Sequence, residues 1–342
     1  MHGGLARSVV CSIVALVAMM PLVPAARAGD KSLIAALNNG DELRYTYTAR
    51  NDETSGITGN PGLGAASVST ETVGLVIRCK ADTTALRIIE VTYESFRLTL
   101  DSPAGKLDID LGGPSPGSDA TPLAREVYAS MHGIVGLTLT LNTAPGSGDI
   151  TLFHGDDGLL KSTGVGLLRR YLERDYFTAT FGPIFQLKSN SAAPPPGQEW
   201  WMQRHIFSLA HAGKTSVWET RVVETVLADI STVKGKIRAT GNPEGSEKAA
   251  VFFKSITGEV VYKWDMFRSR LLSVTRTESV SSRFASNALL RETDVKTTST
   301  LEFVKPAPKR PEPAAQQPTA KPIAPVSIPA SGGDAAGGKP TP

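Results

Sequence analysis

The sequence predicts a mainly β protein: curved antiparallel sheets, two or three helices packed against them, and a disordered C-terminal tail. Two observations carry this prediction. Stretches of alternating apolar and polar residues recur along the chain, and successive residues of a strand face opposite sides of a sheet. From Lys305 onward the composition changes to one rich in proline and alanine. Strands with one apolar face need a cover for it, so the sheets are expected to be layered.

The first 28 residues have the three zones of a secretory signal peptide. Arg7 gives the start a positive charge, Val9 to Val23 are almost wholly apolar, and Ala26-Arg27-Ala28 is a small-residue cleavage site. The apolar run is shorter than the roughly 20 residues that a membrane-spanning helix needs. We therefore expect cleavage after Ala28, a secreted or periplasmic location, and no transmembrane segment in the mature chain.

Charge and cysteine content argue against two classes of protein. The chain holds 36 basic and 33 acidic residues, and cleavage removes Arg7 and Arg27. This balance argues against nucleic acid as a partner, because such binding needs a concentrated basic footprint. Cleavage also removes Cys11 and leaves Cys79 as the single cysteine, so the mature chain can form neither an internal disulfide nor a cysteine-based zinc site. No cofactor is expected.

The proline run Pro194-Pro195-Pro196 divides the body into two strand-rich halves, residues 29–190 and residues 191–304. The halves open similarly, with Gly40-Asp41-Glu42-Leu43 in the first and Gly197-Gln198-Glu199-Trp200 in the second. This similarity indicates an internal duplication, although four residues alone do not establish one. Whether the halves are one domain or two stays open.

Alternating stretches predict strands with one wet face. In Leu43 to Arg50 the odd positions are apolar or small, whereas the even positions are polar. The pattern recurs in Val73–Cys79, Val135–Leu141, Val233–Ala239, Val260–Met266 and Thr293–Phe303.

One strand changes phase. Its apolar residues fall at odd positions up to Tyr93 and at even positions from Phe96. A single-residue bulge near Glu94-Ser95 would bring both sets to one face and bend the strand, as a curved sheet requires.

Helix and loop signals are fewer. Thr121-Pro122 supplies an N-cap and a first-turn proline, and apolar residues follow at helical spacing to Met131. A second helix is expected near residues 157–174, although glycines weaken its first half, and a short one at residues 32–37. In residues 51–66 and 112–120 glycine, serine and proline recur, and both segments are expected to form exposed loops.

The last segment, residues 305–342, is expected to be a disordered, proline-rich tail. It has almost no large apolar side chains. Such a composition cannot bury enough apolar surface to offset the entropy of ordering. The tail is either a solvated extension or a tether that reaches the cell wall.

Five segments follow the predicted signal peptide in a recognisable order: Gly40–Tyr45, Gly133–Leu141, the Gly146 and Gly148 turn, Gly197–Trp200 and the hairpin Val260–Leu272. Together these features resemble a family of uncharacterised exported bacterial proteins known from planctomycete-type genomes. The resemblance covers about residues 40–304 and implies no established activity. Its motifs are structural glycines and a tryptophan. More loosely, a curved sheet with helices resembles the half-barrels of periplasmic lipoprotein carriers such as LolA and LppX, which is a likeness of architecture alone.

The densest polar cluster is His154-Gly155-Asp156-Asp157. An imidazole and two carboxylates could ligate a metal or form an acid/base pair. Alternatively, the segment is a strand-to-helix turn in which Gly155 bends the chain and an aspartate caps the helix. The structural interpretation is favoured, and we assign no catalytic, cofactor-binding or metal-binding residue.

Two surface features are candidate ligand contacts. Trp200 and Trp201 are adjacent, so on a strand they point to opposite faces; the exposed one could stack on a sugar or acyl ligand, unless both pack under the proline run. Lys234, Lys236 and Arg238 form a basic strand face that could meet anionic lipid or wall polymer, unless it is simply solvated.

The sequence therefore favours a non-enzymatic binding or scaffold module of the cell envelope, with an apolar ligand on a curved sheet as one form of it. Two alternatives stay open. One is a secreted hydrolase with a site near His154, Asp156 and Asp157, and the other is a purely structural wall-associated protein. A lipid or a cell-wall component is the expected partner.

Overall fold

The computed structural model describes residues 32–57, 60–155, 171–188, 193–207, 214–239, 250–286 and 289–304. All of them belong to one compact unit, Met1–Lys305. The signal peptide, Asp156, Asp157 and the C-terminal tail lie outside the described residues, so the expectations for them stay predictions. No helix among the described residues is long and apolar enough to span a membrane.

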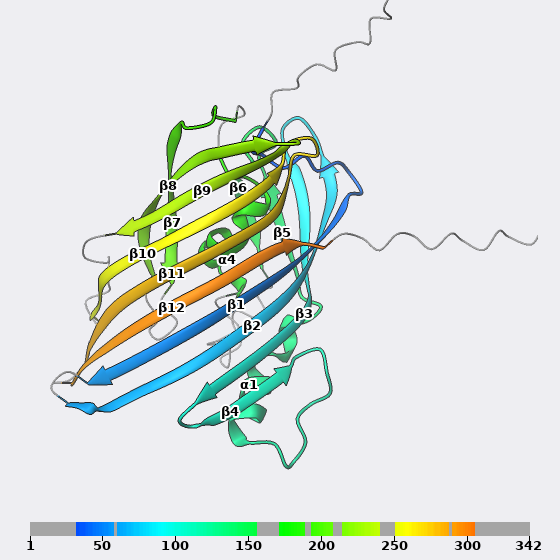
Figure 1. Cartoon of the computed structure of the whole chain (residues 1–342). Helices are drawn as coiled ribbons and strands as arrows, with labels where there is room; N and C mark the ends of the chain where they lie inside the picture. The colour runs from blue at the N-terminus through cyan, green and yellow to red at the C-terminus, as the bar shows by residue number, and fades with distance from the viewer. Residues whose placement is uncertain are drawn as a thin grey trace, which may run out of the picture. The chain divides into compact units, whose positions relative to one another are not determined.

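A single curved antiparallel sheet of twelve strands dominates the described chain (Figure 1). The strand order is β6-β5-β3-β2-β1-β12-β11-β10-β9-β8-β7, with β4 paired to β3, so the sheet is open and ends in β6 and β7. This confirms the predicted fold class. The strands are β1 (Glu42–Ile57), β2 (Asn60–Asp82), β3 (Arg87–Ser102), β4 (Gly105–Asp110), β5 (Thr138–Thr143), β6 (Ile150–His154), β7 (Glu199–Phe207), β8 (Lys214–Leu227), β9 (Ile230–Ala239), β10 (Ala250–Asp265), β11 (Arg270–Ser286) and β12 (Leu289–Phe303).

Strands from both sides of the proline run belong to this one sheet. β1 pairs antiparallel with β12, from Tyr45 opposite Phe303 to Ile57 opposite Arg291. The ladder continues on either side of that pair, through β2 in one direction and β11 in the other. The two halves therefore share a sheet and one hydrophobic core.

The predicted bulge is present in β3. Leu75 of β2 pairs with Tyr93 and its neighbour Gly74 pairs with Ser95, so the register skips Glu94. Tyr93 and Phe96 are consequently both buried. The bulge thus places the two phases of the apolar pattern on one face, as the sequence indicated.

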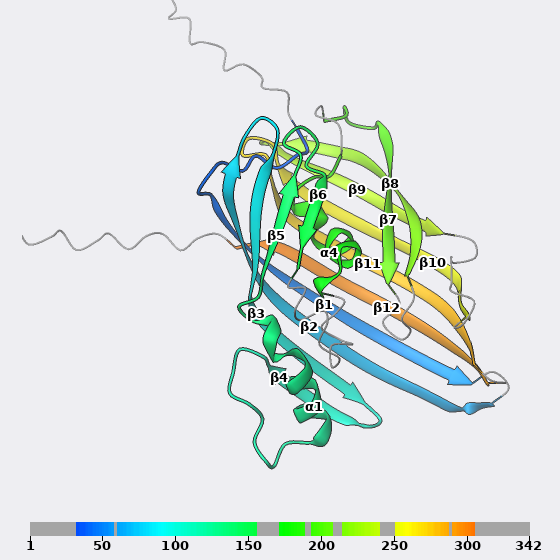
Figure 2. The same ribbon diagram turned by 180° about the vertical axis from the view of Figure 1, so that it is seen from behind.

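Helix α1 (Pro122–Met131) confirms the first predicted helix. The Thr121 hydroxyl accepts a hydrogen bond from the backbone N–H of Ala124 at 3.2 Å, and Pro122 opens the first turn. Val127 and Met131 are buried, and a 3₁₀ turn, η1 (His132–Ile134), follows. Figure 2 shows α1 beside β4.

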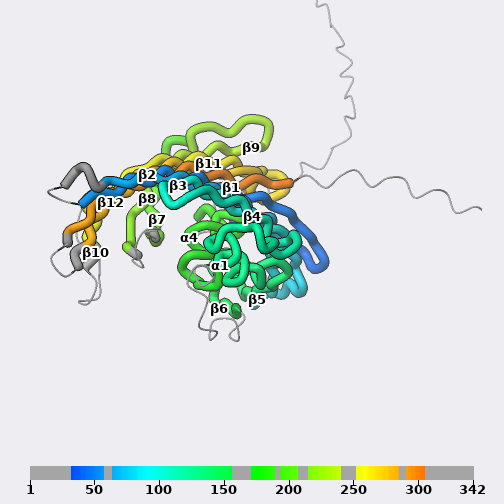
Figure 3. The backbone as a smooth tube through the Cα atoms, turned by 90° about the horizontal axis from the view of Figure 1, so that it is seen from below, coloured from blue at the N-terminus to red at the C-terminus, as the bar shows by residue number. Residues whose placement is uncertain are grey.

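Helix α4 (Arg174–Phe181) lies on the concave side of the sheet, followed by the 3₁₀ turn η2 (Gly182–Ile184) (Figure 3). It begins where the helix predicted for residues 157–174 was expected to end; residues 156–170 lie outside the described part. Its Phe177 ring packs against Phe153 and Phe185, and its Phe181 ring against Tyr47. These aromatic contacts cover the apolar face of the sheet that the alternation predicted.

The expected helix at residues 32–37 was wrong. This segment is extended: Ala35 N–H donates to the carbonyl of Phe185 at 2.8 Å, and Leu187 N–H donates to the carbonyl of Leu33 at 2.8 Å. Six residues offer too few hydrogen bonds to offset the cost of starting a helix. Pairing with the segment after α4 satisfies the same backbone groups.

The expected loop at residues 51–66 was also wrong over most of its length. β1 continues to Ile57 and β2 begins at Asn60, with pairing from Asn51 opposite Ser69 to Ser55 opposite Ala65. β1 also pairs with β12 over the same stretch. Ladder hydrogen bonds on both sides therefore override the unfavourable glycine content of this stretch.

The turn between β5 and β6 approaches the segment after α4 closely at Gly148, which has a φ of +72°. A Cβ atom there would lie 2.8 Å from the carbonyl oxygen of Phe185. We expect Gly148→Ala to lower the free energy of unfolding by about 2 kcal/mol, because a non-glycine residue in this conformation costs about 1–3 kcal/mol. Urea denaturation measures this change.

Gly146 in the same turn is the matched control. A Cβ atom at Gly146 would meet nothing within 4 Å, and this glycine is not among those with positive φ. Gly146→Ala should therefore change the free energy of unfolding by less than about 0.5 kcal/mol. Equal effects of the two substitutions would contradict the close packing at Gly148.

Candidate functional site

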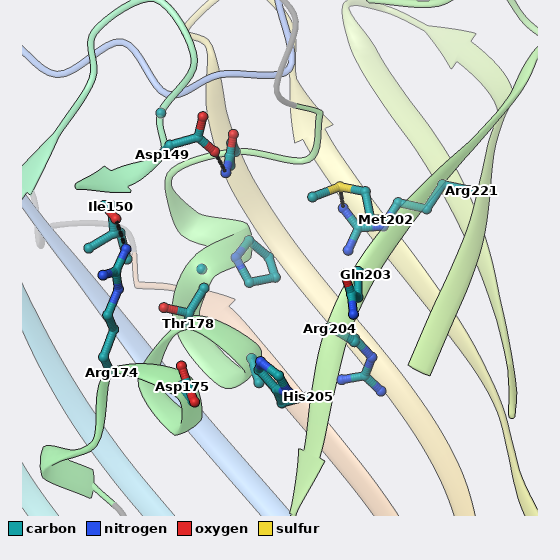
Figure 4. A pocket seen from close by; sticks show the side chains of 15 residues that line it. Asp149, Ile150, Arg174, Asp175, Thr178, Met202, Gln203, Arg204, His205 and Arg221 are labelled. Carbon is teal, nitrogen blue, oxygen red and sulfur yellow. Dashed lines mark hydrogen bonds between the residues drawn. The ribbon is translucent and has the colours of Figure 1, made fainter. Parts of the chain in front are cut away.

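A cavity of about 450 Å³ lies on the concave side, between α4, the β5–β6 turn and β7 (Figure 4). One wall comes from α4, with Arg174 and Thr178, and the facing wall comes from β7 and β8. The titratable side chains of the lining are Asp149, Arg174, Asp175, Arg204, His205 and Arg221. The lining also contains apolar residues, so the cavity presents both charged and apolar surface.

Arg221 of β8 is held from several directions. Its Nε donates to Glu219 Oε1 at 2.6 Å, one Nη donates to the carbonyl of Leu187 at 2.7 Å, and the other donates to the Tyr262 hydroxyl at 2.9 Å. The guanidinium also lies 4.6 Å from the centre of the Tyr262 ring. Arg221 thus links β8 to β10 and to the segment after α4.

Glu219 is the centre of this charged network and is fully buried. Its Oε1 also accepts from the Tyr262 hydroxyl at 2.6 Å, and its Oε2 lies 3.4 Å from Arg204 Nε. Burial by itself would raise the pKa of Glu219, but attraction to Arg221 and Arg204 outweighs it and lowers the pKa to about 2. Burial raises the pKa of Tyr262 to about 12. At neutral pH the carboxylate is therefore ionised and the phenol is not.

A second carboxylate extends the network onto β11. Glu278 forms ion pairs with Arg204 and, at 3.2 Å, with Arg276 Nε. The Arg204 side chain is only 9% exposed, and its Nε makes no hydrogen bond among the described residues. The directly connected network therefore contains three arginines, at positions 204, 221 and 276, and two glutamates, at positions 219 and 278.

Two glycines inside strands make room for these carboxylates. Gly235 of β9 lies opposite Arg221, and a Cβ atom there would be 2.5 Å from Glu219 Oε1. Gly258 of β10 lies opposite Glu278, and a Cβ atom there would be 3.1 Å from Glu278 Cγ. A glycine in a strand interior often marks such a close approach. Gly235 lies inside the strand predicted for Val233–Ala239, at an inward-facing position where an apolar side chain would be expected. This glycine was the one sequence signal that a large side chain from a neighbouring strand fills the space.

A smaller cavity of about 80 Å³ continues along the concave face beside the network. The buried Glu71 lies in its lining and accepts hydrogen bonds from the hydroxyls of Tyr171 and Tyr176. Arg204 and Arg276 line the same space. Polar groups therefore follow the concave surface from β7 to β2.

Trp200 and Trp201 point to opposite faces of β7, as predicted. Trp200 packs against the core, and its indole N–H donates to the carbonyl of Leu187 at 3.3 Å, the same oxygen that Arg221 binds. Trp201 is exposed. Neither tryptophan lines the cavity, but Trp200 supports the carbonyl that orients Arg221.

The predicted polar cluster is not part of the cavity. His154 is exposed at the end of β6 and is not in the cavity lining, while Asp156 and Asp157 lie outside the described residues. His205 does line the cavity, and its ring nitrogen lies 3.3 Å from the Ser216 hydroxyl. Among the residues with described positions, no group of three or more histidine, cysteine or acidic side chains could hold a metal ion.

Comparisons with known proteins show distant likenesses of structure. No family model matches the chain, and no curated protein matches it significantly. A lipovitellin structure, described by its lipid–protein interactions, is 13% identical with a TM-score of 0.45; the match covers 82% of this chain and 27% of lipovitellin.

Two further structures match with lower TM-scores. Pseudomonas aeruginosa OpdO is 10% identical with a TM-score of 0.21, over 78% of this chain and 98% of its own. An outer membrane channel from Pseudomonas putida F1 is 9% identical with a TM-score of 0.19, over 81% of this chain and 98% of its own. This chain thus spans about a quarter of lipovitellin and is similar to all three only at low identity.

Proposed function

We propose that the mature chain is a non-enzymatic binding protein of the cell envelope, and that its concave cavity holds a small anionic amphiphile. The observation that carries this proposal is the cavity of about 450 Å³, whose wall contains the buried Arg221 and Arg204, a side chain that is only 9% exposed. Its volume falls within the roughly 300–1,000 Å³ of known small-molecule sites.

The arrangement of charges in the wall favours an anion. Arg204 and Arg221 line the cavity, whereas Glu219, the carboxylate that both contact, is fully buried and is not in the lining. The two aspartates of the lining come from the β5–β6 turn and from α4, so the β7–β8 wall is the cationic side. Guanidinium groups match carboxylate and phosphate oxygens with paired hydrogen bonds.

The rest of the lining favours a ligand that also has an apolar part. Ile150, Ala179, Pro183 and Met202 contribute apolar surface to the same cavity. A wholly apolar ligand would displace water from this charged wall without replacing the hydrogen bonds of that water, which costs free energy. An amphiphile with one acidic group satisfies both parts of the lining, and this refines the apolar ligand expected from the sequence.

The hydrolase alternative has less support. Its site would centre on His154, which is exposed and outside the cavity, and its carboxylates lie beyond the described residues. We therefore propose binding rather than catalysis, and the cell-envelope location rests on the predicted signal peptide.

Titration of the mature protein with dodecanoate tests this proposal, with uncharged dodecanol as the matched probe. We expect calorimetry to detect dodecanoate binding and no comparable binding of dodecanol. Arg204→Met, which removes a cation of the β7–β8 wall, should weaken dodecanoate binding by about tenfold or more in a variant that circular dichroism shows to be folded, because a hydrogen bond to a charged group contributes roughly 1.5–3 kcal/mol. Thr178→Trp, which places a large side chain in the cavity from the exposed side of α4, should abolish binding.

Arg50→Met is the control for the loss of one positive charge. Arg50 is exposed on β1, where it pairs with Asp52 at 2.9 Å, and it does not line the cavity. This variant should bind dodecanoate like the wild type. Unchanged binding by a folded Thr178→Trp variant would contradict the cavity as the site.

A further inference from the structure

The outer face of β7 and β8 carries two exposed tryptophans. Trp201 is 63% exposed and Trp218 is 53% exposed. Trp201 lies opposite Thr220, and Trp218 lies opposite Gln203, two residues further along each strand. Residues that are diagonal to each other on adjacent strands point to the same face, with their positions about 8 Å apart. The two indoles are therefore diagonal neighbours. Because Glu219 and Arg221 alternate with Trp218 along β8, this face of β8 is opposite the one that carries the buried charged network.

Next to the tryptophans, β9 presents a cationic row on the same face. Arg238 lies directly opposite Trp218, and Lys236 lies opposite Thr220. Lys234 forms an ion pair with Glu224 at 2.6 Å. Within the described part of the chain, the side chains of Lys236 and Arg238 form neither an ion pair nor a hydrogen bond. Two cations are thus available to an incoming ligand.

A groove of about 480 Å³ continues this surface across β9, β10 and β11. The outward side chains of the groove form two rows that run across the strands. One row begins at Thr220 of β8 and the other at Trp218. Every outward side chain of the groove bears a charge or a hydroxyl group. The rows are Lys236, Glu259, Thr277 and Arg238, Thr257, Ser279.

We propose that this outer strip, formed by Trp201, Trp218, Lys236, Arg238 and the groove, binds an acidic polysaccharide. Indole rings present a flat apolar surface with a polar edge, which suits the face of a sugar ring. Lys236 and Arg238 supply the charge complementary to uronate carboxylates, and the groove hydroxyls can exchange hydrogen bonds with sugar hydroxyls.

The dimensions and polarity of the strip favour a polymer over a membrane. From β7 to β11 it spans roughly 19 Å at about 4.8 Å per strand, which suits an extended chain. A membrane-binding surface would present apolar side chains around its cations, so that they enter the acyl boundary. The groove offers none pointing outward. Gln203, which lies opposite Trp218, also lines the cavity, so the strip borders the cavity at the edge strand β7 and extends away from it across β8 to β11.

Gel affinity electrophoresis with polygalacturonate tests the proposal, with the fully methyl-esterified polymer as the uncharged match. We expect the mature protein to be retarded by polygalacturonate and not by the esterified polymer. The double variant Trp218→Ala, Arg238→Gln should weaken the retardation by about tenfold or more. Both positions are on the surface, and circular dichroism confirms that the variant is folded.

Lys263→Gln, Phe267→Ala is the matched control, since it also removes one exposed cation and one exposed aromatic ring, away from the strip. It should bind like the wild type. Thr178→Trp should also leave polysaccharide binding unchanged, which separates this site from the cavity. Equal retardation by the esterified polymer, equal weakening in the control, or binding to phosphatidylglycerol vesicles in place of polygalacturonate would overturn the proposal.

Discussion

Replacing Glu219 with glutamine is expected to lower the free energy of unfolding by about 3–5 kcal/mol. The carboxylate is fully buried and contacts both Arg221 and Arg204. Removing its charge leaves cations buried without compensation, which is far more costly than losing a pair at the surface. Urea denaturation of the two proteins measures the difference.

Glu224→Gln on the same strand is the control. Glu224 is exposed and pairs with Lys234 at 2.6 Å. Because exposed ion pairs contribute about 0–1 kcal/mol, this variant should be nearly as stable as the wild type. A small effect of Glu219→Gln, similar to that of the control, would contradict the buried network.

The pH dependence of stability reports on the same carboxyl group. Its pKa is about 2 in the folded protein against an ordinary value of 4.5, so the unfolded chain binds more protons in this range. The stability it contributes is present above about pH 4.5 and is lost as the pH falls towards 2. At about 1.4 kcal/mol per pKa unit, the loss is roughly 3 kcal/mol. Glu219→Gln should have a flatter acid limb, and an unchanged limb would contradict the assignment.

Phe177→Ala is expected to lower the free energy of unfolding by about 3–5 kcal/mol. The ring is fully buried in α4, with its centre 5.5 Å from that of Phe153 and 5.3 Å from that of Phe181. Truncating a buried phenylalanine loses its transfer free energy and leaves a cavity. Thermal and urea unfolding both measure the change.

Phe267→Ala provides the comparison for Phe177→Ala, because Phe267 is 82% exposed in the turn between β10 and β11. It should alter the free energy of unfolding by less than about 0.5 kcal/mol. Similar effects of the two substitutions would show that α4 does not pack into the core.

Helix α4 also connects the core to the cavity. Residues four apart share a face of a helix, so Phe177 and Phe181 face the core while Arg174 and Thr178 face the cavity. Phe177→Ala should therefore also weaken dodecanoate binding.

Features with a local signal could be predicted from the sequence. The strand around Val233 to Ala239 followed from strict alternation, and the bulge at Glu94 from one change of phase. The first helix followed from Thr121-Pro122, whose side chain and ring act at the first turn. In each case the residues that determine the structure are neighbours in the chain.

The site could not be predicted in this way, because its partners come from separate strands. Glu219 and Arg221 look like solvent-facing polar residues, yet the buried Val217 and Val223 share their face of β8. Their compensating groups come from β7, β10 and β11, and only the strand order brings these together. The pairing of β1 with β12, which joins the halves, is likewise absent from any local pattern.

The proximity of Trp201 and Trp218 was missed for a related reason. Alternation places each of them on the outer face of its own strand, but only the register of β7 with β8 makes them neighbours. The basic residues of β9 were recognised, whereas their position beside Trp218 depends on the next ladder. A surface site built across strands is therefore a property of register.

Photo-crosslinking of a diazirine-labelled dodecanoate to the mature protein, followed by peptide mapping, tests the binding role of the cavity most directly. We expect the label to attach to the cavity walls, in residues 174–186 of the α4 segment and residues 202–205 of β7, and we expect excess dodecanoate to prevent it. Labelling confined to the outer face, or labelling that excess dodecanoate does not reduce, would contradict the cavity as a binding site.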